Sequence, residues 1–220
     1  MTGCCCAPSG YDEFFGEKQA RKDARHYRKK GLHAPARWIV DMVRSRGLEG
    51  ATVLEPGGGV GAIQLELLKA GATHATVVEL SPGYEEEAVA LAREAGLEER
   101  IERHLGDFAA DGVSDADVVV LHRVVCCYPD YERLLGAAAS HARRVLVFTH
   151  PPRNIVSRAL FAAGNLFMRL RGRDFRAFAH PPHALIATVR AHGFEPFAFR
   201  FGGIWRGAAF VRAQEEGAVR

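Results

Sequence analysis

The sequence lacks any run of 18 apolar residues, which is about the length that a membrane-spanning helix needs. The longest candidate, 155–170, is interrupted by Arg158, Asn165 and Arg169. Near Met1 there is no positively charged segment followed by an apolar one, so we expect no signal peptide. These absences favour a cytoplasmic protein without stable membrane insertion.

Cysteine is scarce and unevenly placed. The five cysteines form two clumps, Cys4 to Cys6 and Cys126–Cys127, whereas the half-cystines of a disulfide framework are usually spread along the chain. Paired thiols could bind zinc or trivalent arsenic. Adjacent cysteines chelate poorly, however, so we predict no metal site and leave the role of both clumps open.

Net charge is also low, at +3, but it is unevenly distributed. Residues 17–30 carry seven Lys or Arg against two acids, and 143–176 carry eight Arg against one acid. Between them, 79–117 carries twelve acids and three Arg. A uniformly basic surface would indicate nucleic-acid binding, and this chain does not have one. The basic segments are interpreted as solvated helix faces or as an entrance for an acidic substrate.

Helix-like and strand-like segments alternate along the 220 residues, which is a length typical of one domain. Short apolar runs separated by helices of ten to fifteen residues predict βαβ units and a parallel sheet covered on both faces. The expected strands are 51–55, 74–80, 101–105, 117–121 and 144–149, and the expected helices are 17–30, 35–46, 63–70, 83–95 and 131–140.

The pattern changes after His150. Two helices are expected at 155–170 and 182–192, and then two β-rich runs, 194–201 and 204–211, are separated only by a glycine pair, which is a hairpin signal. The segment at about 152–180 is therefore interpreted as a helical substrate cover on a domain spanning 48–220. Residues 1–47 are interpreted as a helical lid or cap.

A glycine cluster provides the strongest chemical signal. Gly57, Gly59 and Gly61 follow the first strand and precede a helix, where glycine allows a sharp turn and close approach of the backbone to a ligand. Glu79 ends the next strand, where an acid accepts hydrogen bonds from ribose hydroxyls. The spacing Gly-x-Gly-x-Gly and the acid Glu55 before it favour a cationic methyl donor over a pyrophosphate.

These motifs resemble class I S-adenosylmethionine-dependent methyltransferases. Val-Leu-Glu-Pro-Gly-Gly-Gly-Val-Gly is similar to the family's first motif, and Val-Val-Glu79-Leu-Ser to its second. The resemblance implies an α/β, Rossmann-like, doubly wound sheet of seven strands, mostly parallel, with an antiparallel C-terminal hairpin and helices on both faces. It further implies S-adenosylmethionine as cofactor and S-adenosylhomocysteine as product. Gly106–Asp107 resembles the position whose acid meets the adenine amino group. The expected cofactor-binding residues are Tyr11, Glu55, Gly57, Gly59, Gly61, Glu79, Leu80, Gly106, Asp107, Phe108 and Leu121.

A weaker similarity links the chain to magnesium-protoporphyrin IX O-methyltransferases. It rests on 121–129, on the arginine-rich helix after His150 and on 177–181 with the helix that follows. Those enzymes tend to carry His-Tyr-Pro where this chain has Cys127-Tyr128-Pro129. The resemblance therefore implies methyl transfer to a small molecule, but we do not expect the porphyrin to be the substrate.

The segment after the fourth strand is where such folds present substrate to the methyl group. His122 is a candidate general base, Arg123 a candidate partner for an anionic acceptor, and His150 a second candidate base. Each could instead have a structural role, as a backbone-bonded histidine or a plain ion pair. The substrate-binding candidates are Tyr27, Tyr128, Phe167 and His180.

The expected function is methyl transfer to a small molecule, most simply to an oxygen of a hydrophobic or anionic compound. A thiol, a metalloid such as trivalent arsenic, or a nitrogen are alternative acceptors. A nicotinamide-dependent oxidoreductase and a non-catalytic binding module are alternatives of other classes. No Asn/Asp-Pro-Pro-Tyr motif follows the fourth strand, so base methylation and a nucleic-acid partner are not expected. A homodimer is one possible assembly, through the edge of the hairpin.

Overall fold

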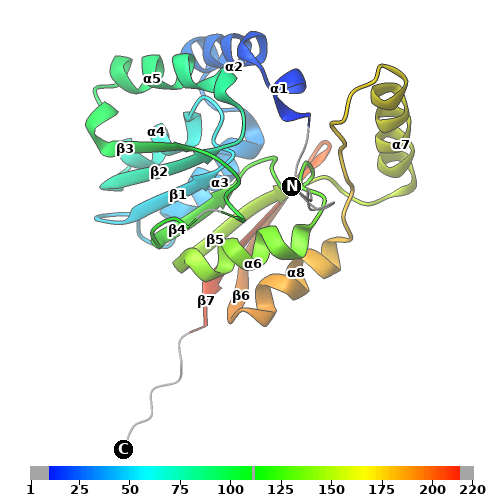
Figure 1. Cartoon of the computed structure of the whole chain (residues 1–220). Helices are drawn as coiled ribbons and strands as arrows, with labels where there is room; N and C mark the ends of the chain where they lie inside the picture. Colours follow the sequence, from blue (N-terminus) through cyan, green and yellow to red (C-terminus); the bar gives the residue numbers. More distant parts are fainter. Residues whose placement is uncertain (1–9, 111, 214–220) are drawn as a thin grey trace, which may run out of the picture.

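The computed structural model describes residues 10–110 and 112–213. Their seven strands form one sheet in the order β3-β2-β1-β4-β5-β7-β6 (Figure 1). The strands are β1 (Thr52–Pro56), β2 (His74–Glu79), β3 (Ile101–Leu105), β4 (Ala116–Leu121), β5 (Ala142–His150), β6 (Phe194–Gly202) and β7 (Trp205–Arg212). Strands β1 to β5 are parallel, and β7 is antiparallel to both β5 and β6. This confirms the predicted fold class.

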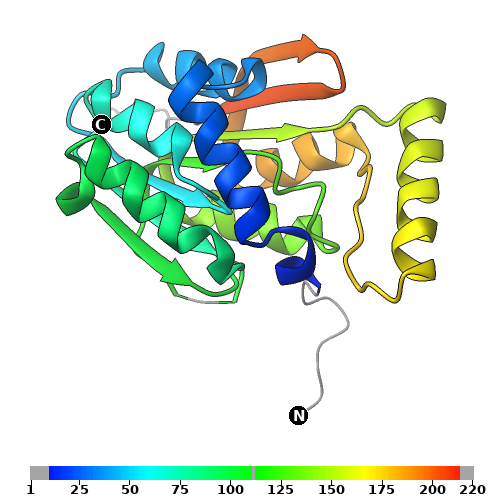
Figure 2. The same ribbon diagram turned by 90° about the horizontal axis from the view of Figure 1, so that it is seen from above.

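Helices cover both faces of the sheet. One face carries α3 (Ala34–Arg44), α4 (Ala62–Lys69) and α5 (Glu85–Glu94), and α2 (Glu17–Lys30) packs on α5. The other face carries α6 (Tyr131–His141) and α8 (Pro182–Ala191) (Figures 1 and 2). Alternate residues of one strand serve both layers, because Val53 belongs to the first apolar cluster and Leu54 to the second. This is why the strands are continuous apolar runs.

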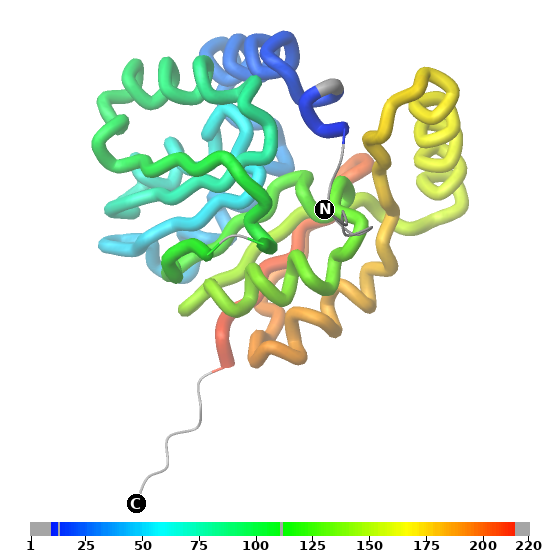
Figure 3. The backbone as a smooth tube through the Cα atoms, viewed as in Figure 1, coloured from blue at the N-terminus to red at the C-terminus, as the bar shows by residue number. Residues whose placement is uncertain are grey.

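The short α1 (Tyr11–Phe14) and the long α7 (Ile155–Leu170) lie outside this layered core. Two 3₁₀ turns, η1 (Pro82–Tyr84) and η2 (Glu98–Arg100), precede α5 and β3. Figure 3 shows the chain leaving the sheet after β5, forming α7 at one side, and returning to begin α8. No helix in the described parts of the chain has the length and hydrophobicity needed to cross a bilayer.

The proposed boundary at residue 47 separates elements that differ in their packing. Ile39, Met42 and Val43 of α3 are buried in the main apolar cluster, so α3 is a core helix of the same body. At the edge where the glycine loop is found lie α1, one side of α2 and the short connection that leads into α3. The boundary at residue 47 stays a prediction.

The sheet order reverses between β1 and β4, where neighbouring crossovers lead to opposite faces. A crevice opens at such a point beyond the carboxyl ends of the strands, and ligands of open α/β sheets bind there. The glycine loop after β1 lies at this switch point.

Candidate cofactor and active site

The glycine loop is shaped for close approach of its backbone to another molecule. Gly57, Gly59 and Gly61 all have positive φ, at 65°, 55° and 79°. A Cβ atom on Gly57 would lie 2.6 Å from Cγ2 of Val124, which is closer than two carbon atoms can pack. The loop therefore requires glycine both for its conformation and for the space beside β4.

Glu79 ties this loop to the end of β2. Its Oε2 accepts the N–H of Gly59 at 2.9 Å, and its Oε1 accepts the N–H groups of Leu80 at 2.8 Å and Ser81 at 3.1 Å. The carboxylate thus holds two loops in register at the mouth of the crevice. Its position at the cavity wall is suited to hydroxyl donors on a ribose.

Buried polar atoms without partners gather under the glycine loop. Among the described residues these are Oε2 of Glu55, Oε1 of Gln64 and Nη1 of Arg103. Burial raises the pKa of Glu55 to about 8, although the backbone of Gln64 and the charge of Arg103 act in the opposite direction. A buried carboxyl with an unused oxygen beside a glycine cradle fits a ligand that carries positive charge.

The acid after β3 is held by a tyrosine. The hydroxyl of Tyr128 donates to Oδ2 of Asp107 at 2.9 Å, and the N–H of Ala109 donates to Oδ1 at 3.1 Å. Burial, followed by the hydrogen bond to Asp107, raises the pKa of Tyr128 above its usual range. The buried Tyr128 side chain thus fixes the orientation of Asp107, which still lines the cavity.

His122 and Arg123 directly follow β4 and form another part of the cavity wall. Nδ1 of His122 lies 3.2 Å from Oγ1 of Thr149, which accepts the N–H of Arg123 at 2.9 Å. Burial, and then the charges of Arg123 and His33, lower the pKa of His122 to about 3. An imidazole with this pKa is neutral at pH 7 but is a poor acceptor of a proton.

Arg123 is the one non-glycine residue of the described chain with a positive φ, at 63°. Such a conformation costs about 1–2 kcal/mol, and residues held in it gather at functional sites. Its guanidinium carbon lies 5.2 Å from the ring centroid of Trp205, and no described carboxylate lies within ion-pair distance. The side chain is therefore available to an anionic ligand.

Cys126 and Cys127 also line the cavity, and the backbone of Cys127 contacts Tyr11 of α1. Their Sγ atoms are 3.6 Å apart and both thiols are free. The hydrogen bond from Cys127 lowers the pKa of Cys126, whereas the same contact raises that of Cys127. Cys4, Cys5 and Cys6 lie outside the described residues, and of the two clumps the structure describes only Cys126–Cys127.

Aromatic residues join the N-terminus to the segment after α7. The Tyr11 hydroxyl donates to the carbonyl of Cys127, and its ring packs edge-on against Phe175 at 5.5 Å. Phe14 stacks on the same Phe175 ring at 4.7 Å. The carbonyl of Phe15 accepts the Ser81 hydroxyl at 2.7 Å, so α1 bridges the end of β2 and the loop after α7.

Together these groups enclose a cavity of about 550 Å³. Thirteen of the predicted site residues line it: Tyr11, Tyr27, Glu55, Gly57, Gly59, Glu79, Leu80, Gly106, Asp107, Phe108, His122, Arg123 and Tyr128. Sequence reasoning missed Phe161 and Trp205 as lining residues, although the aromatic residues of 155–178 offered a signal for the first.

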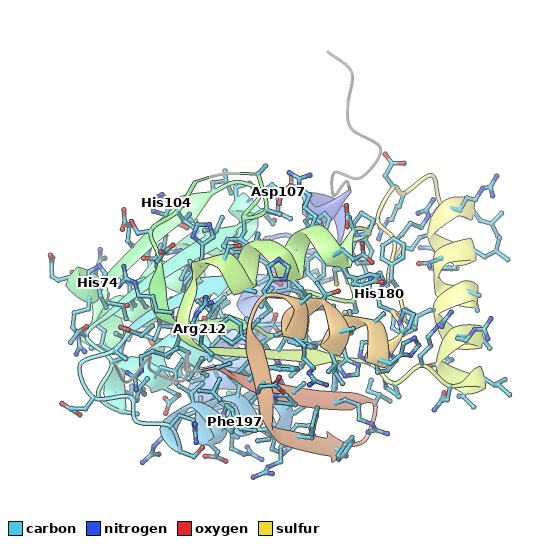
Figure 4. The ribbon with its side chains drawn as sticks, turned by 90° about the horizontal axis from the view of Figure 1, so that it is seen from below. His74, His104, Asp107, His180, Phe197 and Arg212 are labelled. Carbon is cyan, nitrogen blue, oxygen red and sulfur yellow. The ribbon has the colours of Figure 1, made fainter. Side chains whose placement is uncertain are left out.

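Five predicted residues lie outside this lining. Gly61 is the N-cap residue that precedes α4, and Leu121 is buried in the core at the end of β4. His150 is buried, with Nδ1 2.9 Å from the carbonyl of Pro151, and His180 lies just before α8 with Nε2 3.0 Å from the carbonyl of Tyr128 (Figure 4). Phe167 is exposed on α7 beneath Arg171. Their roles stay predictions.

No cluster of three or more metal-ligating side chains occurs among residues 10–110 and 112–213. No protein-family model matches the chain, and no curated protein matches its sequence.

Solved structures do match. Magnesium protoporphyrin IX methyltransferase from Synechocystis PCC 6803, with bound SAH, is 21% identical with a TM-score of 0.73, and the match covers 91% of this chain and 97% of that one. An O-methyltransferase family protein from Burkholderia thailandensis is 21% identical with a TM-score of 0.67, over 92% of this chain and 64% of that one. A putative methyltransferase from Haloferax volcanii, in complex with the Trm112 methyltransferase activator, is 14% identical with a TM-score of 0.70, over 95% and 100%. This chain has the class I fold of S-adenosylmethionine-dependent methyltransferases.

Proposed function

We propose that this protein is a methyltransferase that uses S-adenosylmethionine and acts on an oxygen of a small, hydrophobic, anionic molecule. The observation that carries the proposal is the combination under the glycine loop: a cradle open only to glycine, Glu79 at its rim and the unpaired Oε2 of buried Glu55. The structural neighbours support the enzyme class, since those above are described as methyltransferases.

The cofactor half of the site would be held by β1, β2 and β3. The glycine loop would approach the methionine portion, Glu79 would accept the ribose hydroxyls, and Asp107, held by Tyr128, would face the adenine. Glu55 would balance the positive charge of the ligand. When bound, the cofactor supplies an electrophilic methyl group on a sulfonium sulfur and leaves as S-adenosylhomocysteine.

The acceptor half would be formed by His122, Arg123, Trp205 and Phe161. Aromatic rings suit an apolar body, and the unpaired Arg123 guanidinium suits an anionic group, which it would orient toward the methyl carbon. In the transfer the acceptor oxygen forms a bond to carbon while the carbon–sulfur bond breaks, and the electron pair of that bond goes to sulfur. His122 would form a hydrogen bond with the acceptor, but it is too weak a base to ionise an alcohol.

The low pKa of His122 favours an acceptor that is already ionised, such as a carboxylate, over an alcohol or a phenol. The porphyrin itself is not proposed, because Cys127 stands where the magnesium-protoporphyrin enzymes tend to carry histidine. Thiol or metalloid methylation is a second candidate, and the 3.6 Å separation of the Cys126 and Cys127 sulfurs in the cavity wall is the observation that favours it. We expect a cytoplasmic protein without a nucleic-acid partner, and a homodimer through β6 stays a prediction.

Calorimetric titration with S-adenosylmethionine and S-adenosylhomocysteine tests the cofactor assignment first. We expect micromolar binding of both. A folded sample that binds neither would overturn the proposal.

An acceptor screen with carboxylates, phenols and thiols, followed by production of S-adenosylhomocysteine, then tests the acceptor class. Arg123→Gln should raise the KM of an anionic acceptor about tenfold or more, and Arg123→Lys, which keeps the charge, should raise it less. If both variants had the KM of the wild type, Arg123 would not belong to the acceptor site. Turnover of thiols alone would favour thiol or metalloid methylation.

A further inference from the structure

Helix α7 stands apart from the layered core. Of its 16 residues only Ser157 is buried, in the capping box with Asn154 that begins the helix. Asn165 fixes its middle through two hydrogen bonds to Ala177, at 2.8 and 2.9 Å. Figures 1 and 2 show α7 at the edge of the molecule, linked to the rest by two irregular connections. The helix is thus held in place while most of its surface faces outward.

That outward surface is strongly apolar. Ile155 is 84% exposed, Leu170 is 77% exposed and Leu160 is 65% exposed, and Val156, Leu166 and Phe167 are exposed as well. A helix whose apolar residues face water on this scale lacks the partner that normally covers an amphipathic helix.

The tip of the β6–β7 hairpin has the same character. Phe201 is 71% exposed and Ile204 is 69% exposed. Since His150 pairs with Arg206, this tip lies at the end of β5 from which the chain continues into α7. Both features therefore project from the carboxyl edge of the sheet, on the side where Phe161 and Trp205 line the cavity.

Charge shows what kind of partner fits this surface. Six arginines occur between 153 and 176 against the single acid Asp174, and two more, Arg200 and Arg206, flank the hairpin tip, where 199–206 contains no acid. None of the eight arginines is buried. A second copy of the chain would bring two such surfaces together and place arginine against arginine, so the charge argues for an anionic partner rather than self-association.

The shape and residue types distinguish among anionic partners. Large aliphatic and aromatic side chains project from α7 and from the hairpin tip, and arginines lie among them. Nucleic acids are recognised by basic and stacking residues and gain little from exposed Ile, Val and Leu. A lipid bilayer takes up such side chains at its interface while its anionic headgroups attract arginine.

We propose that α7 and the tip of the β6–β7 hairpin form a docking surface for an anionic lipid bilayer. Docking would turn the Phe161 and Trp205 side of the cavity toward the lipid, from which an amphiphilic molecule could enter. The proposal concerns attachment to the surface, and it does not depend on the activity proposed above.

Sedimentation of the full chain with vesicles tests this directly. Vesicles of phosphatidylcholine with 30% phosphatidylglycerol should bind the protein at least tenfold more strongly than vesicles of phosphatidylcholine alone, and high salt should weaken binding. Leu160→Asp should reduce binding to the anionic vesicles about tenfold. Leu105→Asp is the matched control, because Leu105 on β3 is also 65% exposed and lies outside the surface. Arg169→Glu should reduce binding severalfold more than Arg93→Glu on α5.

Three results would overturn the proposal. One is absence of sedimentation with anionic vesicles by the wild-type chain. Another is an equal loss in Leu160→Asp and Leu105→Asp, or in Arg169→Glu and Arg93→Glu. The third is a concentration-dependent dimer in size-exclusion chromatography that Leu160→Asp abolishes, because a second copy would then be the partner. Circular dichroism of each variant distinguishes lost binding from lost folding.

Discussion

Glu79 shows how one side chain can connect strand geometry with ligand affinity. Its two oxygens accept three backbone N–H groups from the loops after β1 and β2, and it still lines the cavity. Hydrogen bonds to a charged group contribute about 1.5–3 kcal/mol each. Removal of the carboxylate therefore affects both the ligand and the loop that faces it.

Glu79→Ala should weaken binding of S-adenosylhomocysteine about tenfold to hundredfold in calorimetry. Glu79→Gln should fall between wild type and Glu79→Ala, because the amide oxygen can still accept from Leu80 while its NH₂ group faces the N–H of Gly59. Glu102→Gln, on the exposed side of β3, is the control and should leave affinity unchanged. Unchanged affinity in Glu79→Ala would contradict the site assignment.

Glu55 gives the site a pH dependence whose sign follows from its burial. The folded-state pKa is about 8 and the ordinary value is 4.5, so the folded protein binds the proton more tightly than the unfolded chain does. The stability that this group contributes is full below pH 4.5 and is lost as pH rises toward 8, by at most about 1.4 kcal/mol per pH unit. Glu55→Gln should remove this loss.

Urea unfolding of both proteins at pH 5 and pH 8 measures the effect. The wild type should lose stability relative to Glu55→Gln between the two pH values, and a constant difference would show that Glu55 is already ionised. A cationic ligand should also expel the proton, so S-adenosylmethionine should bind more tightly at pH 8 than at pH 6 in the wild type but not in Glu55→Gln.

At this scale the sequence predicted the residues near the glycine loop better than those across the cavity. Gly57, Gly59 and Glu79 follow strands directly, so their place at the sheet edge follows from the order of elements. Trp205 and Phe161 reach the cavity only through the hairpin and α7, whose positions depend on tertiary packing. The low pKa of His122 likewise depends on burial, which its position at the end of β4 does not reveal.

Among the elements, α1 was not predicted from the sequence, because four residues show no helical period. Its place depends on aromatic contacts with Phe175, a residue more than 160 positions away along the chain. Helix boundaries elsewhere moved little: the predicted helix 83–95 is divided into η1 and α5, and 35–46 is observed as Ala34–Arg44. The glycine and proline signals at helix ends account for this agreement.

Phe175→Ala should release α1 without unfolding the sheet. The ring of Phe175 contacts Tyr11, Phe14 and Phe15, whereas the core helices pack on one another independently of it. Amide hydrogen exchange in 11–16 should become about tenfold faster or more, and exchange in β1, β4 and β5 should stay as in the wild type. Phe167→Ala, on the exposed face of α7, is the control. Uniformly faster exchange would instead place Phe175 in the global core.

At the scale of the whole molecule, the sheet joins distant segments around one cavity. Its lining extends from Tyr11 to Trp205, and the glycine loop, the end of β4 and the hairpin each contribute to it. The resemblance to methyltransferases and the glycine pair between the last two strands predicted seven strands with an antiparallel C-terminal hairpin, whereas the order β3-β2-β1-β4-β5-β7-β6 is known from the structure. The local pattern alone fixed only which segments are strands, since any order of parallel neighbours uses the same apolar runs.

Because so much of the chain contributes to this cavity, its ligand should stabilise the fold as a whole. S-adenosylhomocysteine at one hundred times its Kd should add about 2.7 kcal/mol, which for a chain of this size corresponds to a Tm increase of about 5–11 °C. NADH at the same concentration should change Tm by less than about 1 °C, because buried Glu55 lies where its pyrophosphate would have to bind. Differential scanning fluorimetry with both ligands measures this, and Glu79→Ala should need a higher concentration of S-adenosylhomocysteine for the same shift. A shift with NADH and none with S-adenosylhomocysteine would favour an oxidoreductase, and stabilisation by neither would favour a non-catalytic module.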